Sequence, residues 1–325
     1  MRHLRLFAVR LCSAAALIAA IGCGSHPTQD PPKDSGKGTW AALAPYPTPI
    51  VFAGATDLNG TLYVVGGLNS VTTYADTIWA YDPAANTWTA RAPIPTPRLG
   101  LGVTSVNGIL YAIGGSPYHP VNKVEAYDPA SNHWTTKTPM HCAREEFGVG
   151  VVNGTIYVVG GVFGPDCGNA MSVEAYDPVA DTWTPKAPIP VAYLIIRAAV
   201  VNGIVYAVSG IDTTQPGDTI ARFMLHVQAY DPSTDTWTTK SSHAGGGSVG
   251  VGVIDGVIYV LGGNSSSANL AYDPVADTWT VMPSMQHGRS GLAAAAVNGK
   301  LYAVGGDSLM TSSFAMLNWA EAYSP

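Results

Sequence analysis

Three arginines occupy equivalent positions along the sequence, each nine residues before an Asn-Gly dipeptide: Arg98, Arg144 and Arg289. Guanidinium groups bind carboxylates through paired hydrogen bonds, so a ring of arginines suits an acidic ligand. Glu146 lies seven residues before one such dipeptide, and Arg197 lies five residues before another. A carboxylate beside cations can act as an acid or base in proton transfer.

The dipeptide that defines this register occurs six times, each time between two apolar runs. The copies are Asn59-Gly60, Asn107-Gly108, Asn153-Gly154, Asn202-Gly203, Asp255-Gly256 and Asn298-Gly299. Tight hairpin turns need positive φ at both central residues, which Asn, Asp and Gly tolerate, so each copy predicts a β-hairpin. A diglycine follows the second run in five copies, and Ser209-Gly210 takes its place in the fourth.

The octapeptide YDPVADTW occurs at 176–183 and again at 272–279, with close variants elsewhere. The tyrosines of the six copies are residues 81, 127, 176, 230, 272 and 323, which gives spacings of 42 to 54 residues. Each unit therefore predicts four short antiparallel strands, a length typical of one propeller blade. Only 12% of the residues are charged, as expected if most sheet faces are covered by neighbouring blades.

A hairpin turn, a diglycine, Tyr-Asp-Pro and a spaced Trp at this period resemble kelch repeats, over nearly the whole chain after Gly38. The resemblance implies an all-β, six-bladed kelch β-propeller of four-stranded antiparallel blades. No Trp follows Tyr323, but residues 39–45 parallel residues 87–93. We therefore expect the N-terminal strand to complete the sixth blade, which closes the ring and protects two sheet edges.

In such a propeller the first strand of each blade is innermost, and we expect its alternate residues to face the central channel. This places ligand-binding candidates at one mouth of the channel: Arg98, Arg144, Tyr193 and Arg289. Glu146 and Arg197 should lie deeper, on neighbouring blades, as an ion pair or as catalytic candidates. Variable loops after the diglycines border the same mouth, where binding residues usually lie.

The first residues have the features of an export signal, with three arginines before a short apolar run that ends at Cys23. They resemble a bacterial lipoprotein signal, although ordinary secretion with cleavage near Ala20 remains the alternative. The predicted domains are a signal peptide (1–22), a lipid-anchored disordered tether (23–38) and a propeller (39–325). The remaining pair, Cys142 and Cys167, lies on two loops of one blade and should form a disulfide in an oxidising compartment.

The net charge is −6, and loss of residues 1–22 removes three arginines and no acid, which makes it −9. Such a surface, without any basic run, disfavours nucleic-acid binding. The loop histidines show no metal-ligand spacing, so we expect neither metal nor cofactor. They are His119, His141, His226, His243 and His287.

Kelch propellers serve mainly as binding platforms, so the sequence predicts an exported, membrane-anchored monomer that binds a protein, peptide or glycan. The resemblance also implies two enzyme types. One is the sialic-acid mutarotase, in which acidic and arginine side chains act on a sugar; Glu146 and the arginines match that pattern and keep it as the alternative. The other is a copper enzyme like galactose oxidase, for which the histidines make a poor case.

Overall fold

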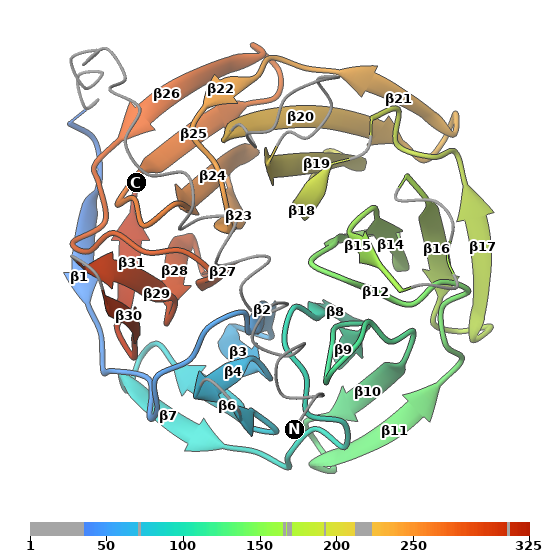
Figure 1. The fold of residues 1–325 in the computed structure, drawn as a ribbon, viewed down its shortest axis with the longest axis horizontal. Coiled ribbons are helices and arrows are strands. Elements are labelled where there is room, and N and C mark those ends of the chain that lie inside the picture. Colours follow the sequence, from blue (N-terminus) through green and yellow to red (C-terminus); the bar gives the residue numbers. More distant parts are fainter. Residues whose placement is uncertain are drawn as a thin grey trace, which may run out of the picture.

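The chain folds into a ring of six four-stranded antiparallel sheets, which we call blades one to six (Figure 1). This computed structural model describes residues 36–70, 73–164, 167, 171–191, 193–211, 223–310 and 313–325. Every regular element among them is a strand, and no helix that could cross a bilayer occurs in these segments. The prediction of an all-β, six-bladed propeller is confirmed. The export signal, Cys23 and most of the tether lie outside the described residues.

Blades one to three follow each other around the ring, each with its innermost strand first. Blade one contains β2 (Gly54–Leu58), β3 (Thr61–Val65), β6 (Ile78–Asp82) and β7 (Thr87–Ala90). Blade two contains β8 (Gly102–Val106), β9 (Ile109–Ile113), β10 (Val124–Asp128) and β11 (His133–Lys137). Blade three contains β13 (Gly148–Val152), β14 (Thr155–Val159), β16 (Val173–Asp177) and β17 (Thr182–Lys186).

Blades four to six complete the ring. Blade four contains β18 (Leu194–Val201), β19 (Ile204–Ile211), β20 (Met224–Asp231) and β21 (Thr236–Thr239). Blade five contains β23 (Val249–Ile254), β24 (Val257–Gly262), β25 (Asn269–Asp273) and β26 (Thr278–Met282). Blade six contains β27 (Ala293–Val297), β28 (Lys300–Val304), β31 (Ala320–Ser324) and β1 (Thr39–Ala42). All six Asn-Gly or Asp-Gly turns join the first two strands, with both residues at positive φ.

Short additional strands extend several blades at one mouth of the channel. They are β4 (Leu68–Ser70) with β5 (Thr73–Tyr74), β12 (Arg144–Glu145) with β15 (Val162–Phe163), and β29 (Asp307–Met310) with β30 (Ser313–Met316). In blade four, β22 (His243–Ala244) pairs with β20. The residue eight before the hairpin turn commonly pairs with the residue after the diglycine, as Leu99 does with Ser116. The same pairing occurs in blades one, three and six, so the residue after the diglycine lies beside the segment that enters the blade.

The ring closes as the sequence predicts, because β1 from the N-terminal side pairs with β31 at the C-terminal end. Trp40 lies opposite Tyr323, in the register that the other blades use for their own Trp and Tyr. The Trp40 Nε1 group donates to the carbonyl of Pro283 in blade five, at 2.7 Å. The edge of β31 is thereby paired, and the sixth blade has four strands like the others.

The repeated Tyr-Asp-Pro segment with its Trp joins each blade to the preceding one at the outer rim. In blade three, the Tyr176 hydroxyl donates to Asp181 Oδ1 at 2.5 Å, and the same oxygen accepts the Thr138 backbone N–H at 2.9 Å. The Trp183 Nε1 donates to the Thr138 carbonyl at 2.9 Å. Equivalent bonds recur in blades one, two, four and five. The octapeptide therefore recurs because it forms this latch between blades.

The apolar core lies between blades, where two sheet faces meet. Leu62 and Val64 of blade one pack in one cluster with Ala293 and Val304 of blade six, and similar clusters follow around the ring. A Cβ added to Gly54 would lie 2.2 Å from a methyl of Val103 in the next blade, so the glycine permits this close approach. Both faces of each sheet are covered, which accounts for the low charge content.

Main-chain hydrogen bonds also link the innermost strands around the mouth. The residue seven before each hairpin turn has positive φ in five blades: Phe52, Gly100, Glu146, Ile195 and Gly291. Four bonds of 2.8–2.9 Å follow from this geometry: Glu146 N–H to Gly100 O, Gly100 N–H to Phe52 O, Phe52 N–H to Gly291 O, and Gly291 N–H to Ser248 O. The left-handed backbone of Glu146 is thus an architectural feature of the ring.

Candidate functional site

A cavity of about 400 Å³ occupies the centre of the ring, lined by the innermost strands of the blades. Consecutive residues of one strand line it, such as Gly54 to Asp57 of β2, because each innermost strand presents its edge to the channel. Small Gly, Ala, Val, Ser and Thr residues dominate the lining. Arg197 and Asp57 are the charged residues of this lining, and the register of the repeats did not predict Asp57 there.

The prediction that alternate residues of the first strand point into the channel is wrong. The side chains of these strands leave the two faces of the blade, and each face packs against a neighbouring blade, as the contact between Gly54 and Val103 shows. The arginines nine residues before the turn consequently do not surround the mouth. The side chains of Arg98, Arg144 and Arg289 are fully buried, with 0% exposure, and none of them lines the cavity.

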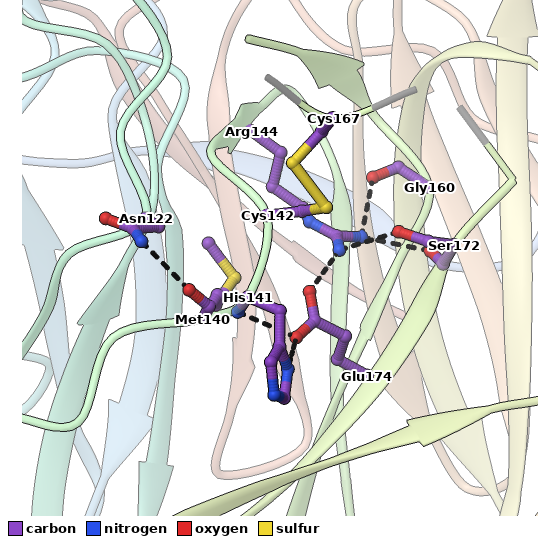
Figure 2. The surroundings of a disulfide bond; sticks show 9 residues. All are labelled: Asn122, Met140, His141, Cys142, Arg144, Gly160, Cys167, Ser172 and Glu174. Carbon is purple, nitrogen blue, oxygen red and sulfur yellow. Dashed lines mark hydrogen bonds and ion pairs between the residues drawn. A yellow bond between two sulfur atoms is a disulfide. The ribbon is translucent and has the colours of Figure 1, made fainter. Parts of the chain in front are cut away.

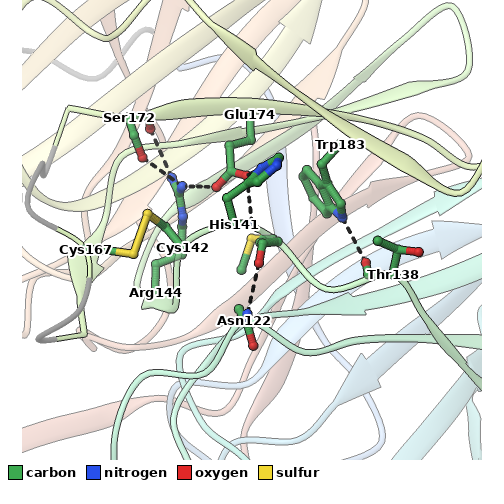
Figure 3. A network of polar contacts seen from close by, with 10 residues as sticks. Asn122, Thr138, His141, Cys142, Arg144, Cys167, Ser172, Glu174 and Trp183 are labelled. Carbon is green, nitrogen blue, oxygen red and sulfur yellow. Dashed lines mark hydrogen bonds and ion pairs between the residues drawn. A yellow bond between two sulfur atoms is a disulfide. The ribbon is translucent and has the colours of Figure 1, made fainter.

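Each buried arginine forms an ion pair with a glutamate on the third strand of its own blade. Arg98 pairs with Glu125 at 2.6 Å, and the equivalent pairs are Arg144 with Glu174 and Arg289 with Glu321. Figure 3 shows Arg144 between Glu174 and Ser172; it donates to the Ser172 carbonyl at 3.0 Å and to the Ser172 hydroxyl at 2.8 Å. The three arginines therefore join strands within a blade.

Burial changes the pKa values of these arginines. Desolvation lowers the pKa of Arg144 to about 10, although the charge and hydrogen bonds of Glu174 oppose the shift. The pKa values of Arg98 and Arg289 are lowered for the same reason. A guanidinium with this pKa stays charged at neutral pH, and its glutamate supplies the compensating charge. No ligand can reach these groups while the blades remain packed.

The sequence contains a signal for this pairing that is visible only when the third strands are compared as well as the first. Glutamate occurs two residues before the repeat tyrosine only in the blades that carry the arginine. Blade one has Ile50 with Trp79 at the two positions, and blade four has Tyr193 with Gln228. The two positions thus vary together from blade to blade, which identifies the pairs.

A disulfide joins Cys142 and Cys167, with their Cα atoms 5.6 Å apart (Figure 2). Cys142 lies in the loop that enters blade three, and Cys167 lies in the loop after its diglycine. Arg144 follows close by and has the Phe163 ring centroid 4.7 Å from its guanidinium carbon. The bond ties two mouth loops of one blade together, beside the buried ion pair of that blade.

Glu146 and Arg197 form the predicted contact between neighbouring blades. Arg197 Nη2 lies 2.7 Å from Glu146 Oε2, with the Arg197 side chain 23% exposed and the Glu146 side chain 10% exposed. The second oxygen, Glu146 Oε1, is buried and has no hydrogen-bond partner among the described residues. A Cβ added to Gly100 would lie 3.0 Å from that oxygen, so Glu146 Oε1 sits against blade two at the rim of the channel.

Glu145 is a second carboxylate at this rim, and the sequence pattern did not predict it. Burial, together with the charge of Glu146, raises its pKa to about 7, and a hydrogen bond with Ser116 of blade two opposes the shift. The pKa of Tyr74 in β5 is raised mainly by burial. Tyr118 and Glu145 lie close enough to add to the shift. The Tyr74 and Tyr118 rings meet edge to face at 5.3 Å, and Tyr118 is 66% exposed.

The remaining candidates do not converge on this rim. Tyr193 is buried, and its ring stacks on His226 at 5.0 Å. His141 donates its backbone N–H to Glu174 and has Nδ1 2.6 Å from the same carboxylate, while His243 and His287 contact tryptophans. Within the described segments, no three His, Cys, Asp or Glu side chains are placed to hold a metal ion.

Comparison with known proteins supports the same architecture. Residues 34–161 match the family model described as the KLHDC2/KLHL20/DRC7 kelch-repeats domain, and residues 143–190 and 246–286 match the kelch motif. A solved structure titled "Structure of YjhT" superposes with a TM-score of 0.67 at 17% sequence identity. The match covers 84% of this chain and 99% of that chain, and at this identity it shows a shared fold.

Proposed function

We propose that this chain, which belongs to the kelch-repeat family, is an extracytoplasmic binding module that takes its ligand at the channel mouth, over Glu146 and Arg197. A protein, a peptide and a glycan are the ligand classes that this site suits. Loops of variable sequence after the diglycines border the mouth, and a rigid scaffold with variable loops favours recognition.

One observation carries the proposal: Glu146 Oε1 is a buried acceptor without a partner among the described residues, and the other oxygen of Glu146 contacts Arg197, which lines the cavity of about 400 Å³. Leaving a buried polar group unsatisfied costs free energy, typically about 1–3 kcal/mol, and more when the group is charged. The Glu146 side chain is 10% exposed, so a ligand whose donor meets this oxygen after a small rotation of the carboxylate recovers that cost. The recovered free energy then contributes to binding.

Binding to immobilised glycans and peptides, followed by titration of the hits, tests the proposal. We expect saturable binding that Glu146→Gln weakens by roughly tenfold, because the carboxylate accepts stronger hydrogen bonds than an amide. Asp255→Asn is the control, since it removes one negative charge from a hairpin turn where the other blades carry Asn. Hits that both variants bind as tightly as the wild type would place the ligand elsewhere and contradict the proposal.

A sugar mutarotase is the second candidate, and the Glu145–Glu146 pair favours it. Glu145, with its pKa near 7, can give a proton to the ring oxygen, while an ionised Glu146 accepts the proton of the anomeric hydroxyl. The C–O ring bond breaks, the carbonyl forms, and reclosure on the opposite face returns both protons. The three buried arginines take no part, which leaves Arg197 as the cation for a sugar carboxylate.

Proton NMR of anomer exchange separates the two candidates. We expect the wild-type protein to bind without accelerating exchange of N-acetylneuraminate or of a neutral hexose. Acceleration that Glu145→Gln and Glu146→Gln both abolish, while Asp255→Asn retains it, would establish the mutarotase in place of the binding module.

We also propose that the protein is exported and held at the membrane by a lipid on Cys23, on the evidence of the N-terminal sequence alone. Metabolic labelling with a fatty-acid analogue tests this. The wild-type chain should take up label, and Cys23→Ala should not. Equal labelling of both would contradict the anchor, and a secreted, unlabelled wild type would favour cleavage near Ala20.

A further inference from the structure

The charges at the channel mouth differ from those expected from the sequence. Every arginine that was predicted to surround the mouth is neutralised by a buried glutamate, and Arg197 is paired with Glu146. Glu145 and Asp307 have no ion-pair partner in the part of the chain that the structure describes. Among these side chains, the carboxylates therefore outnumber the arginines.

The excess carboxylate is centred where blades one, two and three meet. Glu145 faces Ser116 of blade two and lies near Tyr74 of blade one, while Glu146 follows it in sequence and points toward Gly100 and Arg197. Opposite Glu145, the paired strand β15 contributes the uncharged Val162. The nearby cation, Arg197, already contacts Glu146 Oε2. Among the described residues, the site therefore contains an unpartnered, buried carboxylate oxygen, Glu146 Oε1, beside a second acid, Glu145, that is half-buried.

Two aromatic rings complete the surroundings of these acids. Tyr74 and Tyr118 come from the loops of two adjacent blades and meet edge to face, and the Tyr118 ring is largely exposed to solvent. The faces of tyrosine rings attract cations, and a carboxylate beside them adds a charge-assisted hydrogen bond. An anionic ligand, by contrast, would meet two acids and one cation that is already paired.

We propose that the rim formed by Glu145, Glu146, Tyr74 and Tyr118 binds an organic cation, a ligand that presents an ammonium group to the carboxylates. The inference rests on the binding function proposed above and specifies the chemical class of the ligand. A lysine side chain of a peptide and a quaternary ammonium such as choline share this chemistry, and the experiment distinguishes them.

Calorimetric titration with four probes tests the ligand class: Nα-acetyl-lysine amide, its Nε-acetylated twin, choline chloride and N-acetylneuraminate. We expect at least one cation to bind saturably and the neutral twin to bind roughly tenfold more weakly or not at all, because acetylation removes the charge. Binding of the lysine probe alone assigns a peptide-type ligand, and binding of choline alone assigns a quaternary ammonium.

The pH dependence supplies a second readout. A bound cation favours the ionised form of Glu145, whose pKa is near 7, so affinity for a permanently charged probe should rise roughly tenfold between pH 6 and 8. Glu145→Gln should weaken cation binding and remove this pH dependence. Tyr118→Ala should weaken binding while the pH dependence remains, and Asp255→Asn should behave as the wild type.

Three results would overturn the inference. They are failure of both cations to bind, equal affinity for the lysine probe and its neutral twin, and tighter binding of N-acetylneuraminate than of either cation. The broader binding function fails separately, when no glycan or peptide of any charge binds in a manner sensitive to Glu146→Gln. A neutral or anionic ligand that depends on Glu146 would thus contradict the cation inference alone.

Discussion

At the scale of single residues, the buried arginines show how position in a blade determines a role. Arg98 looks like a ligand-binding group in the sequence, yet it donates to Glu125 Oε2 and to the Ala112 carbonyl inside its own blade. Removing one partner of a buried pair leaves the other charge uncompensated, which typically costs about 3–5 kcal/mol. Arg98→Met should therefore destabilise the fold by about that amount, without a direct effect on the channel mouth.

Replacing both partners provides the control for this prediction. The double variant Arg98→Met with Glu125→Met leaves no buried charge and should recover most of the lost stability, as blade one folds with Ile50 and Trp79 at these positions. Urea denaturation of the three proteins measures the difference. A single variant as stable as the wild type would show that the pair contributes nothing.

Glu145 should make the folded protein less stable as the pH rises. Its folded pKa of about 7 lies above the ordinary value of 4.5, so the folded chain retains a proton that the unfolded chain releases. The free energy of unfolding consequently falls as the pH rises through this window, from pH 4.5 to about 7. Glu145→Gln should flatten this fall. Asp307, whose pKa is raised to about 6 by burial, adds a similar slope, so the comparison is best made with Asp307→Asn in both proteins.

At the scale of elements, the repeated octapeptide explains both its constant and its variable positions. The fifth residue after the tyrosine is Asp181 in blade three but Asn86 and Asn132 in blades one and two, and all three make the same two hydrogen bonds. An amide oxygen can accept both bonds, although more weakly than a carboxylate, so Asp181→Asn should cost less than about 1 kcal/mol. Asp181→Ala removes both bonds and should cost about 1–3 kcal/mol. Thermal unfolding measures both, and equal losses in the two variants would show that charge, not the shared oxygen, matters here.

The sequence was most informative about elements whose chemistry is local. The Asn-Gly and Asp-Gly turns need positive φ, and all six form the hairpins that they predict. The channel residues required knowledge of how neighbouring blades pack, which turn chemistry does not contain. Gly54 and Val103 show that an innermost strand directs its side chains toward adjacent blades, so the expected ring of arginines did not form. Glu145 was missed because its burial depends on loops from two other blades.

At the scale of the whole molecule, stability depends on a closed ring in which every blade packs between two neighbours. Each blade is covered by two others, and main-chain bonds around the mouth join blade four through blades three, two, one and six to blade five. An interruption at one place therefore exposes two sheet faces or edges at once. The proposed binding at the mouth would require the ring to be intact, because Glu146 lies between Gly100 of blade two and Arg197 of blade four.

The N-terminal strand is the place where this closure can be tested directly. A chain that begins at Gly36 keeps all of β1, its pairing with β31 and the bond from the Tyr323 hydroxyl to the Lys37 carbonyl. A chain that begins at Tyr46 loses β1 and the Trp40 bond to Pro283, and leaves the edge of β31 in the sixth blade open. We expect the first truncation to melt at nearly the wild-type temperature, and the second to melt several degrees lower and to aggregate. Equal melting temperatures for the two truncations would show that β1 does not close the ring. Loss of cation binding in the second truncation alone would link ring closure to the geometry of the mouth.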